Sequence, residues 1–99
     1  MISHNFTIDV GTTIDAPVGG VLITLRTLDL EHENIVGHST YPPNVKVAMT
    51  EPGGTPKHGE LQVGDAMRFD TQGGVQLELR FMRPENSRLA HFRLTELTS

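Results

Sequence analysis

The sequence predicts an all-β fold, either a compact β-sandwich or a partly open small barrel, with an internal pseudo-twofold repeat. Three observations predict it. Almost every periodic stretch alternates apolar and polar residues, which is typical of half-buried strands. Glycine-rich turns separate these stretches at intervals typical of sandwiches and small barrels. Finally, residues 6–28 and residues 59–82 share the same order of motifs.

The repeat consists of a corner, a turn and a strand end. The first copy has Val10-Gly11 and then Gly19-Gly20-Val21, and the second has Val63-Gly64 and then Gly73-Gly74-Val75. One extra residue near Gln72 keeps the second copy in register, and in both copies the long strand ends in Leu-Arg. We expect each copy to form a strand, a tight hairpin corner, a strand, a turn and a long strand. Two such meanders would face each other across one core.

The remaining elements follow from alternation alone. Residues 44–50 are predicted to form a central strand between the copies, and residues 90–94 a final strand. No window of helical length keeps an apolar face, so the short stretch 28–35 is the best helical candidate. The side chains expected to face the core are Ile8, Val10, Val21, Ile23, Leu25, Val45, Val47, Leu77, Leu79 and Phe92.

The composition fits a single all-β domain over residues 1–99 with one modest core. The net charge of −4 argues against a nucleic-acid partner, because such binding needs a basic face. The absence of cysteine excludes disulfides, thiolate metal sites and cysteine nucleophiles, and it favours a cytoplasmic location. The N-terminal residues are polar and no apolar run is long, so we expect neither a signal peptide nor a membrane partner.

Residues 29–43 separate the two copies and break their symmetry, which makes this connection a natural place to look for function. The connection holds His32 and His38 among carboxylates, and imidazole with carboxylate suits zinc or another first-row metal. His58 could join them if folding brings it close. However, the spacing of His32 and His38 matches no established metal-binding pattern. We interpret the stretch as a polar surface loop and predict no metal and no cofactor.

The same connection ends in Tyr41-Pro42-Pro43, the only aromatic–proline cluster of the chain. Two prolines stiffen an extended segment, and a tyrosine beside them can anchor an interface. Equally, Tyr41 can plug one end of the core while the prolines lead into the central strand. Both interpretations stay open at this point.

A second candidate contact surface lies on the strands. Leu22, Met82 and Leu89 are predicted on strand faces that are otherwise polar. If these side chains gather in one patch, they mark a contact surface. We expect a protein partner to cover it, most simply a second copy in a homodimer.

Residues 61–69, Leu61-Gln62-Val63-Gly64-Asp65-Ala66-Met67-Arg68-Phe69, resemble one motif of the cupins, in which a strand, a Gly-Asp corner and a second strand lead to a glycine turn. At the place of the cupin metal histidine after that turn stands Gly73-Gly74-Val75. The other cupin motif, a His-x-His pair with a following Glu, is absent. The resemblance therefore implies a tight corner at Gly64-Asp65 and no cupin function.

The sequence holds no motif that indicates catalysis. No serine lies in Gly-x-Ser-x-Gly, and no glycine pair belongs to a phosphate-binding loop. Ser39 follows His38 directly, but neighbours on an extended chain point to opposite faces. We therefore interpret the protein as a non-enzymatic binding or assembly module. The alternatives are a small cupin-like β-barrel that binds a metal or ligand through loop histidines, and a subunit of a larger phage or secretion assembly.

Overall fold

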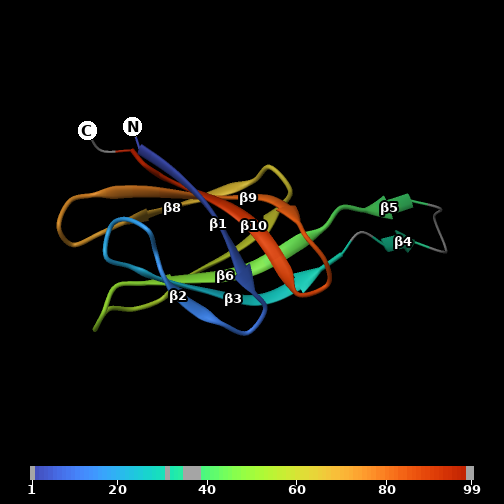
Figure 1. Ribbon diagram of the computed structural model, residues 1–99, viewed down its shortest axis with the longest axis horizontal. Coiled ribbons are helices and arrows are strands. Elements are labelled where there is room, and N and C mark those ends of the chain that lie inside the picture. Colours follow the sequence, from blue (N-terminus) through green and yellow to red (C-terminus); the bar gives the residue numbers. More distant parts are fainter. Residues whose placement is uncertain (1, 31, 35–38, 98–99) are drawn as a thin grey trace.

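The computed structural model describes residues 2–30, 32–34 and 39–97, and all its regular elements there are strands (Figure 1). The strands are β1 (Ile2–Asp9), β2 (Thr13–Asp15), β3 (Leu22–Asp29), β4 (His32–Asn34), β5 (Ser39–Tyr41), β6 (Asn44–Thr50), β7 (Lys57–Gln62), β8 (Ala66–Asp70), β9 (Gln76–Pro84) and β10 (Leu89–Glu96). The central and final strands lie where alternation predicted them. Within the described residues there is no helix that could cross a membrane.

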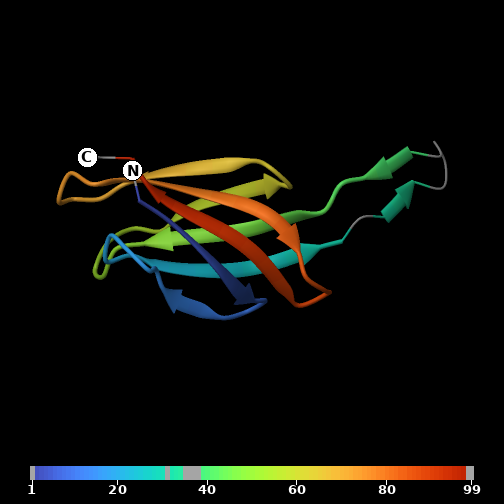
Figure 2. The same ribbon diagram turned by 45° about the horizontal axis from the view of Figure 1, so that its top comes forward.

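Two four-stranded antiparallel sheets pack face to face (Figure 2). Their strand orders are β1-β10-β9-β8 and β2-β3-β6-β7. Strands β4 and β5 form a two-stranded ribbon that extends beyond one end of both sheets (Figure 1). Neither sheet closes on itself, so of the two predicted architectures the protein adopts the sandwich.

The sandwich is built from two similar halves, β1-β2-β3-β6 and β7-β8-β9-β10. The strand orders of the two sheets, β1-β10-β9-β8 and β7-β6-β3-β2, correspond position by position. Strand β1 thus corresponds to β7, β10 to β6, β9 to β3 and β8 to β2. The predicted pseudo-twofold repeat is therefore confirmed. One expectation was wrong: the corner after β1 is not a hairpin. It carries the chain from one sheet to the other, so the first strand of each half pairs within the sheet of the other half.

Both corners are fixed by the same kind of backbone hydrogen bond. The amide of Gly11 donates to the carbonyl of Leu25 (2.7 Å), and the amide of Gly64 donates to the carbonyl of Phe81 (2.8 Å). The counterpart of Leu25 is thus Phe81, although the sequence motifs align Leu25 with Leu79. The reason is that β2 and β3 share three residue pairs whereas β8 and β9 share five. The longer hairpin shifts the Leu-Arg motif away from the corner in the second half.

The core lies between the two sheets and consists of alternating side chains from both. Nine of the ten predicted core residues are buried, and Val10 is half-buried and packs against the core. Phe81 and Phe92, both fully buried, lie with their ring centroids 5.6 Å apart. Alternation predicted the core because each sheet buries one face only.

The stretch considered for a helix, residues 28–35, is extended where it is described. Leu28 and Asp29 continue β3 and pair with Val45 and Asn44 of β6. The pairing with β6 supplies the backbone hydrogen bonds that a helix would otherwise have to form internally. Past this pair the chain runs into the β4–β5 ribbon.

Candidate functional site

A β-bulge in each long strand produces a feature that recurs in both halves. Leu25 pairs with Val47 and Thr27 with Lys46, so Arg26 is an extra residue on β3. A bulge interrupts the ladder and re-aims the side chain of the extra residue. On β9 the extra residue is Met82, because Phe81 pairs with Phe92 while Arg83 pairs with His91. Arg26 and Met82 therefore occupy equivalent positions on opposite sheets.

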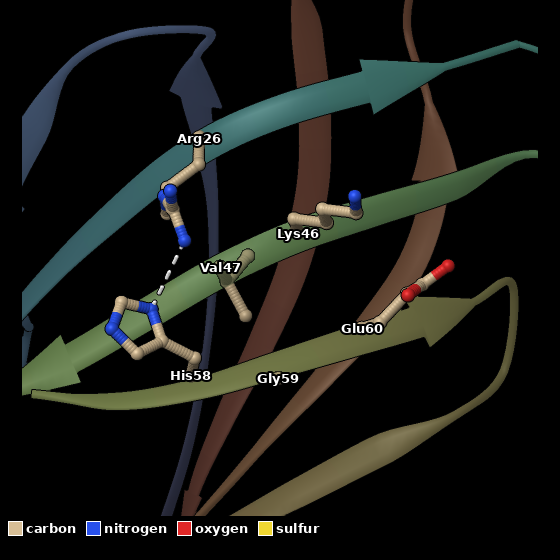
Figure 3. A pocket seen from close by; sticks show the side chains of 6 residues that line it. All are labelled: Arg26, Lys46, Val47, His58, Gly59 and Glu60. Carbon is tan, nitrogen blue, oxygen red and sulfur yellow. Dashed lines mark hydrogen bonds between the residues drawn. The ribbon is translucent and has the colours of Figure 1, made fainter.

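The bulge of β3 borders a shallow depression of about 210 Å³ on the outer face of its sheet. Its lining comes from three neighbouring strands, as Figure 3 shows. The lining residues are Arg26, Lys46, Val47, His58, Gly59 and Glu60. We call this site the first depression.

The bulge of β9 borders a second depression of about 220 Å³ on the other sheet. Its lining residues are Asn5, Phe6, Met82, Arg83, His91, Phe92 and Arg93. Five lining positions are equivalent between the sites, as the strand pairing shows: Arg26 and Met82, Lys46 and His91, Val47 and Phe92, His58 and Asn5, Gly59 and Phe6. The repeat has thus duplicated a surface depression together with the scaffold.

Two of the basic side chains that line the second depression pair with a neighbouring carboxylate. The carboxylate of Glu85 pairs with the ring of His91 and with Arg83 (3.3 Å). The hydrogen bond from His91, together with the charges of His91 and Arg83, lowers the pKa of Glu85 below its ordinary value. The side-chain oxygen of Asn5 accepts a hydrogen bond from Arg93 (3.0 Å). Arg83 and His91 thus share an anionic partner, whereas the partner of Arg93 is a neutral amide.

The first depression lacks this neutralisation. Nη1 of Arg26 lies 3.2 Å from Nδ1 of His58. A guanidinium can only donate, so Nδ1 of His58 accepts and the imidazole is neutral, with its proton on Nε2. Lys46 stands opposite Glu60 in the register, but no ion pair joins them. Among the described residues, neither Arg26 nor Lys46 has an anionic partner.

The three histidines considered as metal ligands are described to different extents. His38 lies outside the described residues, and only the backbone of His32 is described. His58 is exposed on β7, and its described partner is Arg26. No group of three histidine, aspartate or glutamate side chains that could hold a metal is found in the described part of the chain.

The aromatic–proline cluster follows the β4–β5 ribbon. Tyr41 is the last residue of β5 and is the register partner of His32, with only its backbone described. Pro42 is exposed and Pro43 is half-buried at the entry to β6. The prolines thus lie between the ribbon and the sheet. The two interpretations differ on the side chain of Tyr41, which lies outside the described residues.

The apolar residues expected to form one contact patch lie apart. Leu22 begins β3 in one sheet, whereas Met82 and Leu89 belong to the other. All three are half-buried, and each stands next to a residue that is buried in the core, so they face outward. Because the outer faces of two stacked sheets point in opposite directions, the structure does not bring Leu22 together with the other two.

Four strands form the edges of the two sheets, and β1 differs from the other three. It is eight residues long, and Asp9 is its only residue of the types Asp, Glu, Lys and Arg. The edge strand β2 has three residues, while β7 and β8 carry charged side chains along short stretches. Natural sheets protect their edges by shortness and by charge, and β1 has little of either.

Sequence reasoning missed the first depression, although one signal was present. Arg26-Thr27 and Met82-Arg83 each place two outward or irregular positions in succession, which interrupts alternation at the bulges. The clustering of Arg26, Lys46 and His58 could not be predicted, because it depends on the register of three strands. Comparison of the chain with models of protein families, with curated proteins and with solved structures finds no significant match.

Proposed function

We propose that the protein is a non-enzymatic binding or assembly module that forms a homodimer by pairing its β1 edge with β1 of a second copy. The observation that carries this proposal is the long, nearly uncharged open edge of β1. An unprotected edge is a template for strand addition, because its backbone groups are free to bond another chain.

The direction of the free backbone groups follows from one hydrogen bond. The amide of Val10 donates to the carbonyl of Arg88, so the backbone of Val10 faces β10. In an antiparallel ladder alternate residues turn their amide and carbonyl groups to opposite sides. The backbone groups of Ser3, Asn5 and Thr7 therefore point away from β10, toward the open edge.

The outward backbone groups of one β1 strand can pair with the same groups of a second copy. If two copies of β1 pair antiparallel about Asn5, then Ser3 of each copy faces Thr7 of the other. This pairing provides about six backbone hydrogen bonds and places no like charges opposite each other. It also brings Ile2, which is 57% exposed, opposite Ile8 of the second copy. The resulting dimer is closed. Each copy uses its one β1 edge in the interface, so no further copy can add there.

The remaining edges are poorer templates. The ammonium group of Lys57 donates to the carbonyl of Arg68 and so covers part of the β8 edge. Strand β7 carries Lys57 and Glu60, and inserting charges along an edge is a common protection. Strand β2 is too short to offer a comparable ladder.

The test is the mass of the protein in solution, measured by light scattering on a size-exclusion column at micromolar concentration. We expect a mass near twice 10.9 kDa. Thr7→Pro removes an outward amide and places the proline ring against the second copy, so it should give a monomer. The exposed side chain of Thr7 has no hydrogen bond to a described residue, and a proline is tolerated where the lost amide faces solvent.

Two control variants separate this interface from others. Arg68→Pro places a proline at an outward position of the edge strand β8 in the same sheet and should leave the dimer intact. Leu22→Lys, which tests the patch expected from the sequence, should also leave it intact. A monomeric wild-type protein, or a dimer that survives Thr7→Pro, contradicts the proposal. Higher multiples of the monomer mass would instead favour the larger assembly.

A further inference from the structure

We infer that the first depression is a binding site for a small oxyanion, either a phosphate or the carboxylate group of a larger molecule. The inference rests on Arg26, Lys46 and His58, which lie on three adjacent strands around one hollow. It is independent of the proposed dimer, because the site lies on the outer face of the sheet that does not contain β1.

The second depression serves as an internal comparison. There Glu85 binds His91, the counterpart of Lys46, and also Arg83. The counterpart of Glu85 in the first half is Asp29, because each lies three residues after the bulge residue of its half, Met82 or Arg26. Asp29 forms no ion pair with a described residue. In the second half Glu85 supplies the anion. In the first half Arg26 and Lys46 have no anionic partner among the described residues and can bind an external anion.

The donors of the first depression suit an oxyanion. Arg26 uses one N–H toward His58 and keeps further N–H groups in the planar fork that matches carboxylate and phosphate oxygens. The contact with Nδ1 fixes the His58 tautomer, so Nε2 is available as a neutral donor. Lys46 adds an ammonium group without a hydrogen-bond partner among the described residues. In Figure 3 Arg26 and His58 reach toward each other from the two outer strands at the left of the view, and Lys46 lies on the middle strand to their right.

The size and the rim of the site narrow the ligand class. A volume of about 210 Å³ holds one phosphate or carboxylate group with its water, and it leaves no room to enclose a larger molecule. Glu60 lines the rim and repels any anion that enters. We therefore expect weak binding, in the millimolar range typical of exposed sites, and we expect Glu60→Gln to strengthen it.

The experiment is an NMR titration of the ¹⁵N-labelled protein at constant ionic strength, with sodium chloride as the balancing salt. Sodium phosphate and sodium acetate are the two probes, because they separate a phosphate ligand from a carboxylate one. Constant ionic strength is necessary since salt screens exposed charges. We expect saturable shifts for amides of residues 26, 46 and 58–60 with at least one probe.

The matched variants use the repeat itself. Arg26→Met gives the first depression the methionine that the second half has at the equivalent position, Met82. This variant should bind the anion about fivefold more weakly, or weaker still. Arg68→Met removes the same charge from the other sheet and should change the affinity less than about twofold. Glu60→Gln should increase the affinity. No saturable shift with either probe, or equal affinity of wild type and Arg26→Met, overturns the inference.

Discussion

The turn between β2 and β3 carries a substitution whose cost can be worked out from the structure. Gly19 has φ of +87°, and a Cβ added there would lie 2.7 Å from Cδ1 of Leu77. Leu77 is fully buried in the opposite sheet, so a shift of its side chain would disturb the packed core. Gly20 has φ of +67°, but a Cβ at that position meets nothing within 4 Å. The two neighbours thus separate the backbone cost from the packing cost.

The expected magnitudes differ between the two positions. A left-handed backbone costs an alanine about 1–2 kcal/mol, and this applies to both Gly19→Ala and Gly20→Ala. The contact with Leu77 adds the cost of overpacking, about 1–3 kcal/mol, to Gly19→Ala alone. The change in the entropy of the unfolded chain is the same for both and cancels in the comparison. Gly19→Ala should therefore destabilise the protein by about 2–5 kcal/mol.

The assay is urea unfolding of the wild type and both variants at equal protein concentration, with melting curves as a second measure. For a domain of this size each 1 kcal/mol lowers Tm by roughly 4–8 °C. Equal concentration is needed because the proposed dimerisation would make Tm depend on it. If Gly19→Ala and Gly20→Ala destabilise equally, the turn does not pack on Leu77 and the reasoning fails.

Two further predictions concern charge and metal. The pKa of Glu85 is lowered in the folded state, so its carboxylate stabilises the fold above the ordinary glutamate pKa, and this contribution is lost as pH falls through the lowered value. We expect the Tm difference between wild type and Glu85→Gln to narrow from about pH 6 to pH 3, and a constant difference would contradict this. Separately, elemental analysis of protein purified without an affinity tag should find no stoichiometric zinc or nickel, whereas one ion per chain would favour the metal-binding alternative through His32 and His38.

Most of the core could be predicted from the sequence because burial of a single face imposes a period of two. That period correctly assigned Ile23, Leu79 and Phe92 to the interior. The exchange of β1 between sheets could not be predicted in the same way. The corner at Gly11 looks like a hairpin turn in the sequence, and only pairing with β10, far along the chain, shows that it crosses the core.

The candidate site was harder to predict than the core. The basic residues of the first depression, Arg26, Lys46 and His58, are far apart in the chain. In the sequence each of them has the pattern of an ordinary exposed residue on a polar face. Their meeting depends on two registers, of β3 with β6 and of β6 with β7, and on the bulge that shifts the first of them. The alternation pattern constrains which face a residue occupies but does not fix which residues of neighbouring strands stand side by side.

The repeat also separates scaffold from function within one chain. Positions that both halves need for folding keep their role, as the hydrogen bonds of Gly11 and Gly64 show. Equivalent positions without such a role are free to diverge, and the two halves differ in charge at the bulges and at the edges. One bulge carries Arg26 where the other has Met82, and β1 lacks the charges that β7 carries. Since identical scaffolds need no such differences to fold, these are the positions where the two halves are expected to serve different contacts.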